Sequence, residues 1–250
     1  MRVAFAGKGG SGKSVIAGTV ARLLARQGRP VLALDIDTLP GLSFSLGASA
    51  SPSDEGLPAE LALKREGQGW VMKDDVSAET LVDRHAREAP DGIRLLQLGK
   101  LPGHVSAGSV AAFRHVVKGF RRPEWSIVGD LAAGTRQAFF GWAAFATRIA
   151  LVVEPSAASR LTAKRLRGIA DTAPNSRLGL VFNKVRDLGA VEEMALELEL
   201  PVWARVPYDE RVAEAERAGT ALVDGAHPGP ALLAISGLVA KLLAEEAEAV

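Results

Sequence analysis

The chain has 250 residues, 48% of them apolar, with 30 basic and 29 acidic side chains and no cysteine. This length and apolar content suit an α/β domain with a full core and exclude a largely disordered chain. The balanced charge gives no whole-chain argument for nucleic acid or acidic membranes, and the missing cysteine excludes disulfides, thiolate metal sites and Fe–S ligation by its own side chains.

Apolar, β-branched runs alternate with helical patterns along the chain. Continuous runs such as residues 31–34 suit strands that are covered on both faces, which indicates a mostly parallel sheet. The expected strands are residues 2–6, 31–34, 93–98, 126–129, 149–153, 178–182 and 202–206. The expected helices are residues 14–27, 78–88, 109–120, 159–173, 189–197, 212–219 and 230–247.

This alternation predicts a doubly wound α/β fold that forms a single domain over residues 1–250. Residues 47–69 are rich in Ser, Pro, Gly and charge and are interpreted as a loop or small excursion, not as a linker between two cores. The chain enters its first expected strand without a signal peptide, and its apolar stretches are too short or too interrupted to span a bilayer. We therefore expect a cytoplasmic protein.

A glycine-rich turn joins the first expected strand to the first expected helix. Residues 7–14 read Gly-Lys-Gly-Gly-Ser-Gly-Lys-Ser and satisfy G-x-x-x-x-G-K-[ST] in full. Glycines allow backbone N–H groups to turn inward around phosphate oxygens, and the helix that follows adds its positive end. Lys13 is placed to reach the β- and γ-phosphates, and the Ser14 hydroxyl to bind Mg²⁺. The other residues expected to line the nucleotide here are Lys8, Gly9, Gly10, Ser11, Gly12 and Val15.

The same turn also satisfies the dinucleotide pattern G-x-G-x-x-G, through Gly7, Gly9 and Gly12. Asp35 stands at the end of the second strand, where a dinucleotide site would need its ribose-binding acid. That alternative explains neither the Lys13-Ser14 pair nor the further acidic motifs. A phosphate cradle is therefore the favoured interpretation.

Acidic residues end two of the expected strands. Asp35-Ile36-Asp37 closes the second strand, and Asp130 begins the sequence Asp-Leu-Ala-Ala-Gly after the strand at residues 126–129. Ligands of open parallel sheets bind at the carboxyl edge, so these carboxylates are expected beside the glycine turn. Either Asp35 or Asp37 could instead cap the turn that follows.

Residues 8–14 resemble the deviant Walker A motif of the MinD/ParA class of P-loop ATPases. The resemblance extends over nearly the whole chain. It implies a P-loop fold with helices on both faces of the sheet, slow hydrolysis of ATP with Mg²⁺, and a homodimer that closes in the ATP state. Lys8 would then reach the phosphates of the partner subunit, as an arginine finger does, and would act in catalysis together with Lys13.

The acidic motifs match the switch regions of that class. By this match Asp37 would orient the attacking water, Asp35 would act on Mg²⁺ through water, and Asp130 would be the Walker B acid. The class often has Asp-Pro where this chain has Asp37-Thr38, which leaves the carboxylate in place but changes the loop. The backbone N–H of Gly134 would approach the γ-phosphate and sense hydrolysis.

Two later segments resemble the adenine-binding part of the class. Asn183-Lys184 ends the strand at residues 178–182, and Pro207-Tyr208 follows the strand at residues 202–206. The resemblance implies that the Asn183 side chain and the backbone near Pro207 lie on either side of the base. Both segments are also compatible with ordinary turn chemistry at strand ends.

Within the class, the start of the chain and its length look most like the CooC branch, whose members are accessory ATPases of carbon monoxide dehydrogenase maturation. Nickel-handling members carry a Cys-x-Cys where this chain has residues 103–110 without cysteine. Their shared thiolate metal site therefore cannot be carried over. His104 and His115 are weak substitutes, because isolated histidines more often serve packing or the surface. The client protein is not indicated.

A ParA-like positioning ATPase that binds DNA or a scaffold partner is the alternative. Two basic clusters would suit DNA, and each is equally explained as a solvated helix face. They comprise Arg114, His115, Lys118, Arg121 and Arg122, and Arg160, Lys164, Arg165 and Arg167. The chain ends in an acidic helix, which argues against the basic membrane anchor of MinD-type proteins.

Overall fold

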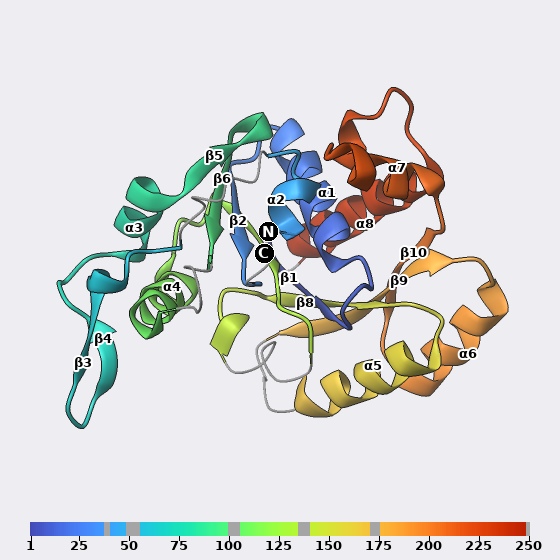
Figure 1. The fold of residues 1–250 in the computed structure, drawn as a ribbon. Coiled ribbons are helices and arrows are strands. Elements are labelled where there is room, and N and C mark those ends of the chain that lie inside the picture. The colour runs from blue at the N-terminus through green and yellow to red at the C-terminus, as the bar shows by residue number, and fades with distance from the viewer. Residues whose placement is uncertain (38–40, 49–55, 100–105, 135–140, 171–175, 249–250) are drawn as a thin grey trace.

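The computed structural model describes residues 1–250 apart from 38–40, 49–55, 100–105, 135–140, 171–175 and 249–250 (Figure 1). The strands are β1 (Arg2–Gly7), β2 (Val31–Asp35), β3 (Ala62–Arg65), β4 (Gly69–Met72), β5 (Arg87–Ala89), β6 (Ile93–Gln97), β7 (Ser126–Asp130), β8 (Arg148–Val153), β9 (Arg177–Val185) and β10 (Val202–Pro207). The α-helices are α1 (Lys13–Arg26), α2 (Gly41–Ser45), α3 (Ala78–His85), α4 (Ala107–Gly119), α5 (Ala157–Ala170), α6 (Leu188–Leu198), α7 (Glu210–Ala218) and α8 (Pro230–Ala247).

Eight strands form one sheet in the order β10-β9-β8-β1-β7-β2-β6-β5. All neighbouring pairs are parallel except β5 with β6. The order reverses around β1, because β8 lies on one side of it and β7 on the other. In open α/β sheets the ligand binds beyond the carboxyl ends of the strands at such a switch point, which is where β1 leads into the glycine turn.

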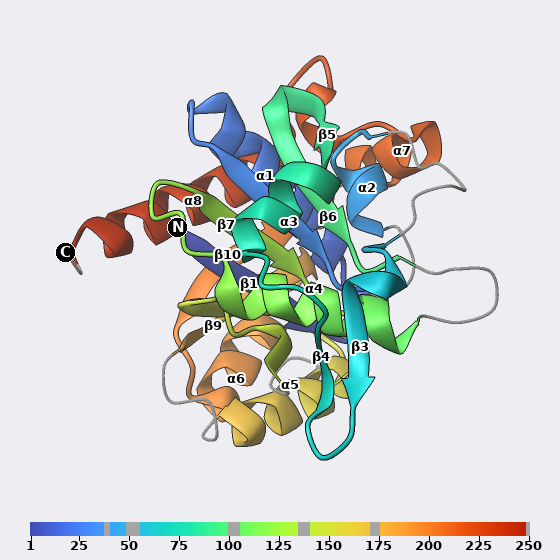
Figure 2. The ribbon, with the colours of Figure 1, turned by 90° about the vertical axis from the view of Figure 1, so that its left-hand side faces the viewer.

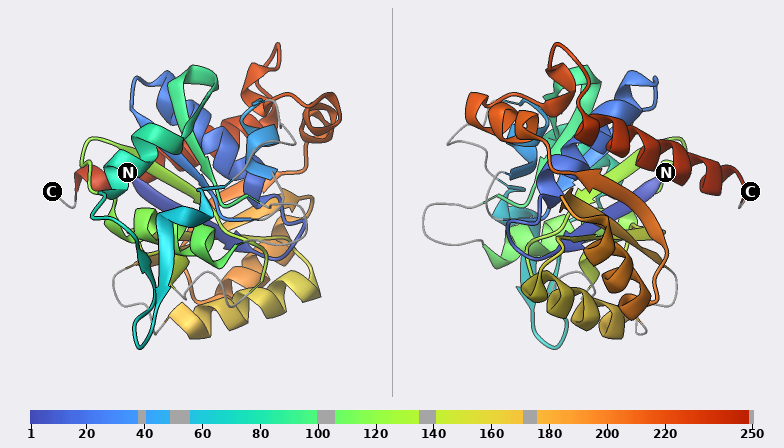
Figure 3. Two further views of the ribbon diagram at one scale, coloured as in Figure 1. Left: turned by 60° about the vertical axis from the view of Figure 1, so that its left-hand side comes forward. Right: turned by 90° about the vertical axis from the view of Figure 1, so that its right-hand side faces the viewer.

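Helices cover both faces of the sheet, and the core is accordingly divided into two layers. Along β1, Ala4 and Ala6 pack into the layer beneath α3, α4, α5 and α6, whereas Val3 and Phe5 pack into the layer beneath α1, α2 and α8. Successive side chains of a strand point to opposite faces, so the apolar run at residues 3–6 supplies both layers. Figure 3 shows α8 on the opposite side of the sheet from α5.

The mostly parallel, helix-covered sheet and all seven expected strands are confirmed, with ends that shift by one to three residues. The expectation of a helix over residues 78–88 is wrong in its last turn. Helix α3 ends at His85, and Arg87–Ala89 pairs antiparallel to β6 as the edge strand β5. The backbone at the helix end, Ala86, is already extended.

The segment predicted as a loop or small excursion contains regular structure. The 3-10 helix η1 (Ala59–Leu61) leads into β3, which pairs antiparallel with β4. Figure 2 shows this hairpin as an arm beside α4. Its base is anchored by Met72, which packs against the buried residues beneath α4, while Trp70 near its tip is 44% exposed.

No helix in the described part of the chain is both long and apolar enough to cross a membrane.

Helix α2 packs directly on the backbone of α1. A Cβ placed on Gly18 would lie 2.6 Å from Ser45 Cβ, whereas one placed on Gly237 of α8 would meet no atom within 4 Å. Alanine normally stabilises a helix interior by about 1 kcal/mol over glycine, but forcing a methyl group into a close-packed contact costs about 1–3 kcal/mol.

Gly18→Ala should therefore lower the free energy of unfolding by up to about 2 kcal/mol, whereas Gly237→Ala should raise it by up to about 1 kcal/mol. Urea unfolding of the two variants measures the difference. Equal stabilisation by both substitutions would contradict the packing of α2 on α1.

Candidate nucleotide-binding site

The glycine turn runs from the end of β1 at Gly7 to the start of α1 at Lys13. Gly10 and Gly12 have φ angles of 77° and 88°, which favour glycine strongly. A side chain at Gly12 would also collide with Asn183, because an added Cβ would lie 2.2 Å from Asn183 Nδ2. The turn thus depends on glycine both for its backbone angles and for its close contact with β9.

Helix α1 begins directly after the glycine turn, and its first turn has no side-chain cap. Its N-cap residue is Gly12, which has no side chain to accept a hydrogen bond from the free N–H groups of this turn. Such N–H groups, together with the helix dipole, form an anion site. The turn is therefore chemically suited to phosphate oxygens.

The two lysines of the turn differ in environment. The Lys13 side chain is buried, and its Nζ donates to the Lys8 carbonyl at 3.4 Å. Lys8 itself is exposed to solvent. One cation of the turn is therefore buried, while the other is exposed to solvent.

Asp35 and Asp130 lie side by side at the carboxyl edge of the sheet, because they are register partners of β2 and β7. Both are buried. Burial, and then the neighbouring Asp130, hold the pKa of Asp35 well above its usual range. Hydrogen bonds from the N–H groups of Asp37 and Leu42 and from the Gln97 amide oppose this shift.

Burial also raises the pKa of Asp130 from its ordinary 3.8 to about 6. The Ser14 hydroxyl and the charge of Lys13 lower that pKa, and Asp37 raises it. The Oδ1 atom of Asp130 is buried and has no hydrogen-bond partner among the described residues. Two adjacent buried carboxylates, one with a free oxygen, together with the Ser14 hydroxyl are a donor set that fits Mg²⁺.

In the described part of the chain, no three His, Cys, Asp or Glu side chains are arranged to hold a metal ion. Mg²⁺ usually takes one or two carboxylates and completes its shell with phosphate and water. His104 lies outside the described residues. His115 Nε2 lies 2.9 Å from the Val76 carbonyl, which supports a packing role for it.

Asp37 and Gly134 follow β2 and β7 at the carboxyl edge of the sheet, next to Asp35 and Asp130. Asp37 is partly exposed, and its charge acts on Asp130. Gly134 has a φ angle of 117°, and its N–H donates to the Gly7 carbonyl at 3.4 Å. The two segments expected to act as switches therefore approach the turn from β2 and β7.

Asn183 and Lys184 contact the glycine turn itself. Asn183 Nδ2 donates to the Ser11 carbonyl at 2.8 Å, and Lys184 Nζ donates to the Gly10 carbonyl at 2.7 Å. Lys184 also pairs with Glu154 at 2.6 Å. Sequence reasoning missed Glu154, since nothing in its local pattern indicates that it lies near residues 30 positions away.

A cavity of about 490 Å³ extends from the turn between β9, β10, α7 and α8. It is lined by Asn183, Lys184, Pro207 and Tyr208, the residues expected near an adenine, and by apolar side chains of α7 and α8. Arg186 stacks on the Tyr208 ring, with its guanidinium carbon 3.6 Å from the ring centroid. A flat, largely apolar base with polar edges suits such a cavity.

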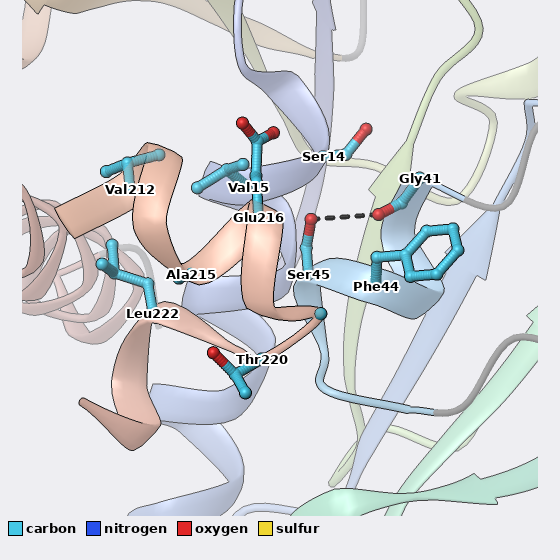
Figure 4. A pocket seen from close by; sticks show the side chains of 11 residues that line it. Ser14, Val15, Gly41, Phe44, Ser45, Val212, Ala215, Glu216, Thr220 and Leu222 are labelled. Atoms are coloured by element: carbon cyan, nitrogen blue, oxygen red, sulfur yellow. Dashed lines mark hydrogen bonds between the residues drawn. The ribbon is translucent and has the colours of Figure 1, made fainter. Parts of the chain in front are cut away.

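A second cavity of about 270 Å³ adjoins the first. Both are lined by Ser14, Val15, Val212 and Glu216. Figure 4 shows how α2 and α7 contribute to the second cavity from opposite sides, with Val15 of α1 beside them. Glu216 and helix α2 were not indicated by the sequence.

A parallel sheet with a glycine phosphate turn and buried acids at its carboxyl edge defines a P-loop nucleotide-binding protein. The family model for the CobQ/CobB/MinD/ParA nucleotide binding domain matches residues 3–223. The chain therefore belongs to this family of nucleotide-binding domains.

Related proteins agree with this assignment. An uncharacterized ATP-binding protein of Methanocaldococcus jannaschii is 31% identical over 236 residues, which cover 88% of this chain and 90% of that protein. The carbon monoxide dehydrogenase accessory protein CooC of Rhodospirillum rubrum is 28% identical over 248 residues, covering 90% of each. The structure of the septum site-determining protein MinD from Pyrococcus horikoshii, complexed with Mg-ADP, has a TM-score of 0.69 and 18% identity, and covers 96% of this chain and 95% of that chain.

The buried charge at Asp130 should reduce stability in the absence of nucleotide. Because its pKa is about 6 in the folded protein and lower in the unfolded chain, the protonated form favours folding. This contribution is fully present below pH 4 and is lost as the pH rises through 6. Asp130→Asn should thus be about 1–3 kcal/mol more stable than the wild type at pH 7.5.

Urea unfolding of both proteins without nucleotide, at pH 7.5 and at pH 4.5, measures this difference. The advantage of Asp130→Asn should shrink at the lower pH. An Asp130→Asn protein that is less stable than wild type at pH 7.5 would show that ionised Asp130 is favourably paired.

Proposed function

We propose that the protein is a slow ATPase that acts as a molecular switch, binding ATP with Mg²⁺ and closing as a homodimer. The whole chain, residues 1–250, would form one such domain. The contrast between the two lysines of the turn carries this proposal: Lys13 is buried, and Lys8 is exposed to solvent. An exposed ammonium group beside a phosphate site can reach a nucleotide that is bound to a second subunit.

Within one subunit, the residues divide the binding of ATP between them. Lys13 and the N–H groups of residues 9–15 would hold the phosphates, and Ser14, Asp130 and Asp35 would hold Mg²⁺ directly or through water. Bound Mg²⁺ neutralises phosphate charge. Asn183, Lys184, Pro207 and Tyr208 would surround the adenine, which the cavity between β9 and β10 supports. The Mg-ADP in the MinD of P. horikoshii is consistent with this assignment.

Hydrolysis would depend on two further charges. Asp37 stands at the partly exposed end of the Asp35-Ile36-Asp37 segment and would orient the attacking water. Lys8 from the other subunit would stabilise the charge that develops on the transferred phosphoryl group. Neither role requires chemistry beyond positioning and electrostatics.

The similarity to CooC over nine-tenths of both chains supports an accessory or maturation role toward a client protein. Because this chain has no cysteine, it would not hold a metal cargo on thiolates of its own. The switch would then act through nucleotide-dependent association with the client. Its chemistry would not include metal transfer by a Cys-x-Cys pair.

The alternative of a ParA-like positioning ATPase on DNA has less support. Basic residues of α5 form salt bridges with carboxylates of α6 and with Glu199, the residue that follows α6. Arg122 forms a salt bridge with Asp83. The pairs are Arg160 with Glu193 and Glu197, Lys164 with Glu197, Arg167 with Glu199, and Arg122 with Asp83. Exposed pairs add little stability, but they reduce the positive potential that binding to phosphate backbones requires.

Lys8→Ala should abolish the ATP-dependent dimer while leaving the monomer folded. Loss of a charge supplied in trans should also lower the hydrolysis rate about 10³-fold. Light scattering with ATP and Mg²⁺ measures the dimer, and phosphate release measures the rate. Lys73→Ala, at an exposed position beyond the hairpin, is the matched control. Equal dimer content in Lys8→Ala and the control would refute the trans role.

Asp37→Ala should retain ATP binding but lose most phosphate release, because the attacking water is no longer oriented. Calorimetric titration with ATP and a phosphate-release assay separate the two effects. Unchanged turnover in Asp37→Ala would assign the positioning of water to another residue.

A further inference from the structure

Behind Asp35 lies a chain of hydrogen-bonded polar side chains that the proposed chemistry does not use. Gln97 ends β6, Ser43 belongs to α2, and Arg87 begins β5. Ser43 is fully buried, and Gln97 is 9% exposed. Gln97 Nε2 lies 2.8 Å from Ser43 Oγ and 3.4 Å from Asp35 Oδ2.

The orientation of the Gln97 amide is fixed by its other partner. Arg87 Nη2 donates to Gln97 Oε1 at 3.4 Å and to Ser43 Oγ at 2.8 Å. Since arginine can only donate, it must face the amide oxygen, which leaves the NH₂ group for Ser43 and Asp35. The hydrogen bonds therefore run in one direction: Arg87 donates to Gln97, and Gln97 donates to Asp35.

Asp35 Oδ2 accepts a second hydrogen bond from the same helix that carries Ser43. The Leu42 N–H donates to it at 3.3 Å. Helix α2 is thus joined to the carboxylate directly through its backbone and indirectly through Ser43 and Gln97. Phe44, which follows Ser43 in α2, is 49% exposed and lines the second cavity, to which α7 also contributes (Figure 4).

We propose that Gln97 is a positioning residue that ties helix α2 to the Asp35 carboxylate, so that the helix beside the nucleotide cavity and the Mg²⁺ side of the site move as one unit. The donor group of Gln97 is the essential feature, because an acceptor there would face the carboxylate oxygen. The part of this inference that concerns Mg²⁺ rests on the proposed function. The tie between α2 and Asp35 does not.

Hydrogen–deuterium exchange of the protein without nucleotide tests the tie itself. Gln97→Met removes the amide at similar volume, and Gln97→Glu keeps its shape but replaces the donor by an acceptor. Both should speed exchange of the amides at residues 41–45 about tenfold, since a buried polar group that loses its hydrogen-bond partner bears the full cost of its desolvation. Gln68→Met, the same change at an exposed turn position, should leave exchange at the wild-type rate.

Wild-type exchange at residues 41–45 in both Gln97 variants would overturn the proposal. If Gln97→Met does not fold, the isosteric Gln97→Glu decides alone. A variant Ser43→Ala, which keeps the Gln97–Asp35 contact, should speed the same amides by a smaller factor.

The second measurement is the Mg²⁺ concentration that half-saturates ATP binding, read by calorimetry. Gln97→Met and Gln97→Glu should raise it about tenfold, with ATP affinity in the absence of Mg²⁺ unchanged. An unchanged Mg²⁺ requirement in both variants would overturn the link to the metal site. A wild-type protein that binds no Mg²⁺–ATP would refute the proposed function, and the exchange experiment would still test the tie.

Discussion

The site depends on the burial of two carboxylates next to each other at the carboxyl edge of a parallel sheet. Asp35 and Asp130 are placed there by the register of β2 and β7, and neither can separate from the other while the sheet is intact. Burial makes the ionised form of each costly, and repulsion adds to that cost, from Asp130 on Asp35 and from Asp37 on Asp130, as the raised pKa values indicate. A cation beside Lys13 and Ser14 would relieve that cost, so folding leaves this edge ready for a metal and its phosphates.

The elements around the edge are tied to it by hydrogen bonds whose partners are distant in sequence. The glycine turn is fastened to β9 by Asn183 and Lys184, and α2 is fastened to Asp35 by Leu42, Ser43 and Gln97. A shift of either segment therefore changes the surroundings of the phosphate site. Such coupling is what a nucleotide-dependent switch requires, because each nucleotide state must favour one arrangement of the neighbouring segments.

The sequence predicted the central sheet well, because buried parallel strands are continuous apolar runs that need no tertiary information. It missed β5 because Arg87–Ala89 is a short, charged edge strand that continues a helical pattern. The glycine turn could be found from its motif, and the acids at Asp35 and Asp130 from their places at the ends of expected strands. Gln97 could not, because its role comes from contacts with Ser43 and Arg87, 54 and 10 residues away.

We propose that the site for each nucleotide is completed by Lys8 of the other subunit. Mixing Lys8→Ala with Asp37→Ala tests it directly, because the mixed dimer contains one site with an intact Asp37 that receives Lys8 from its partner. Phosphate release is measured for each variant alone and for the equimolar mixture with ATP and Mg²⁺. Phosphate release from the mixture should be well above that of either variant alone, and a rate equal to the mean of the two would show that Lys8 does not act across the dimer.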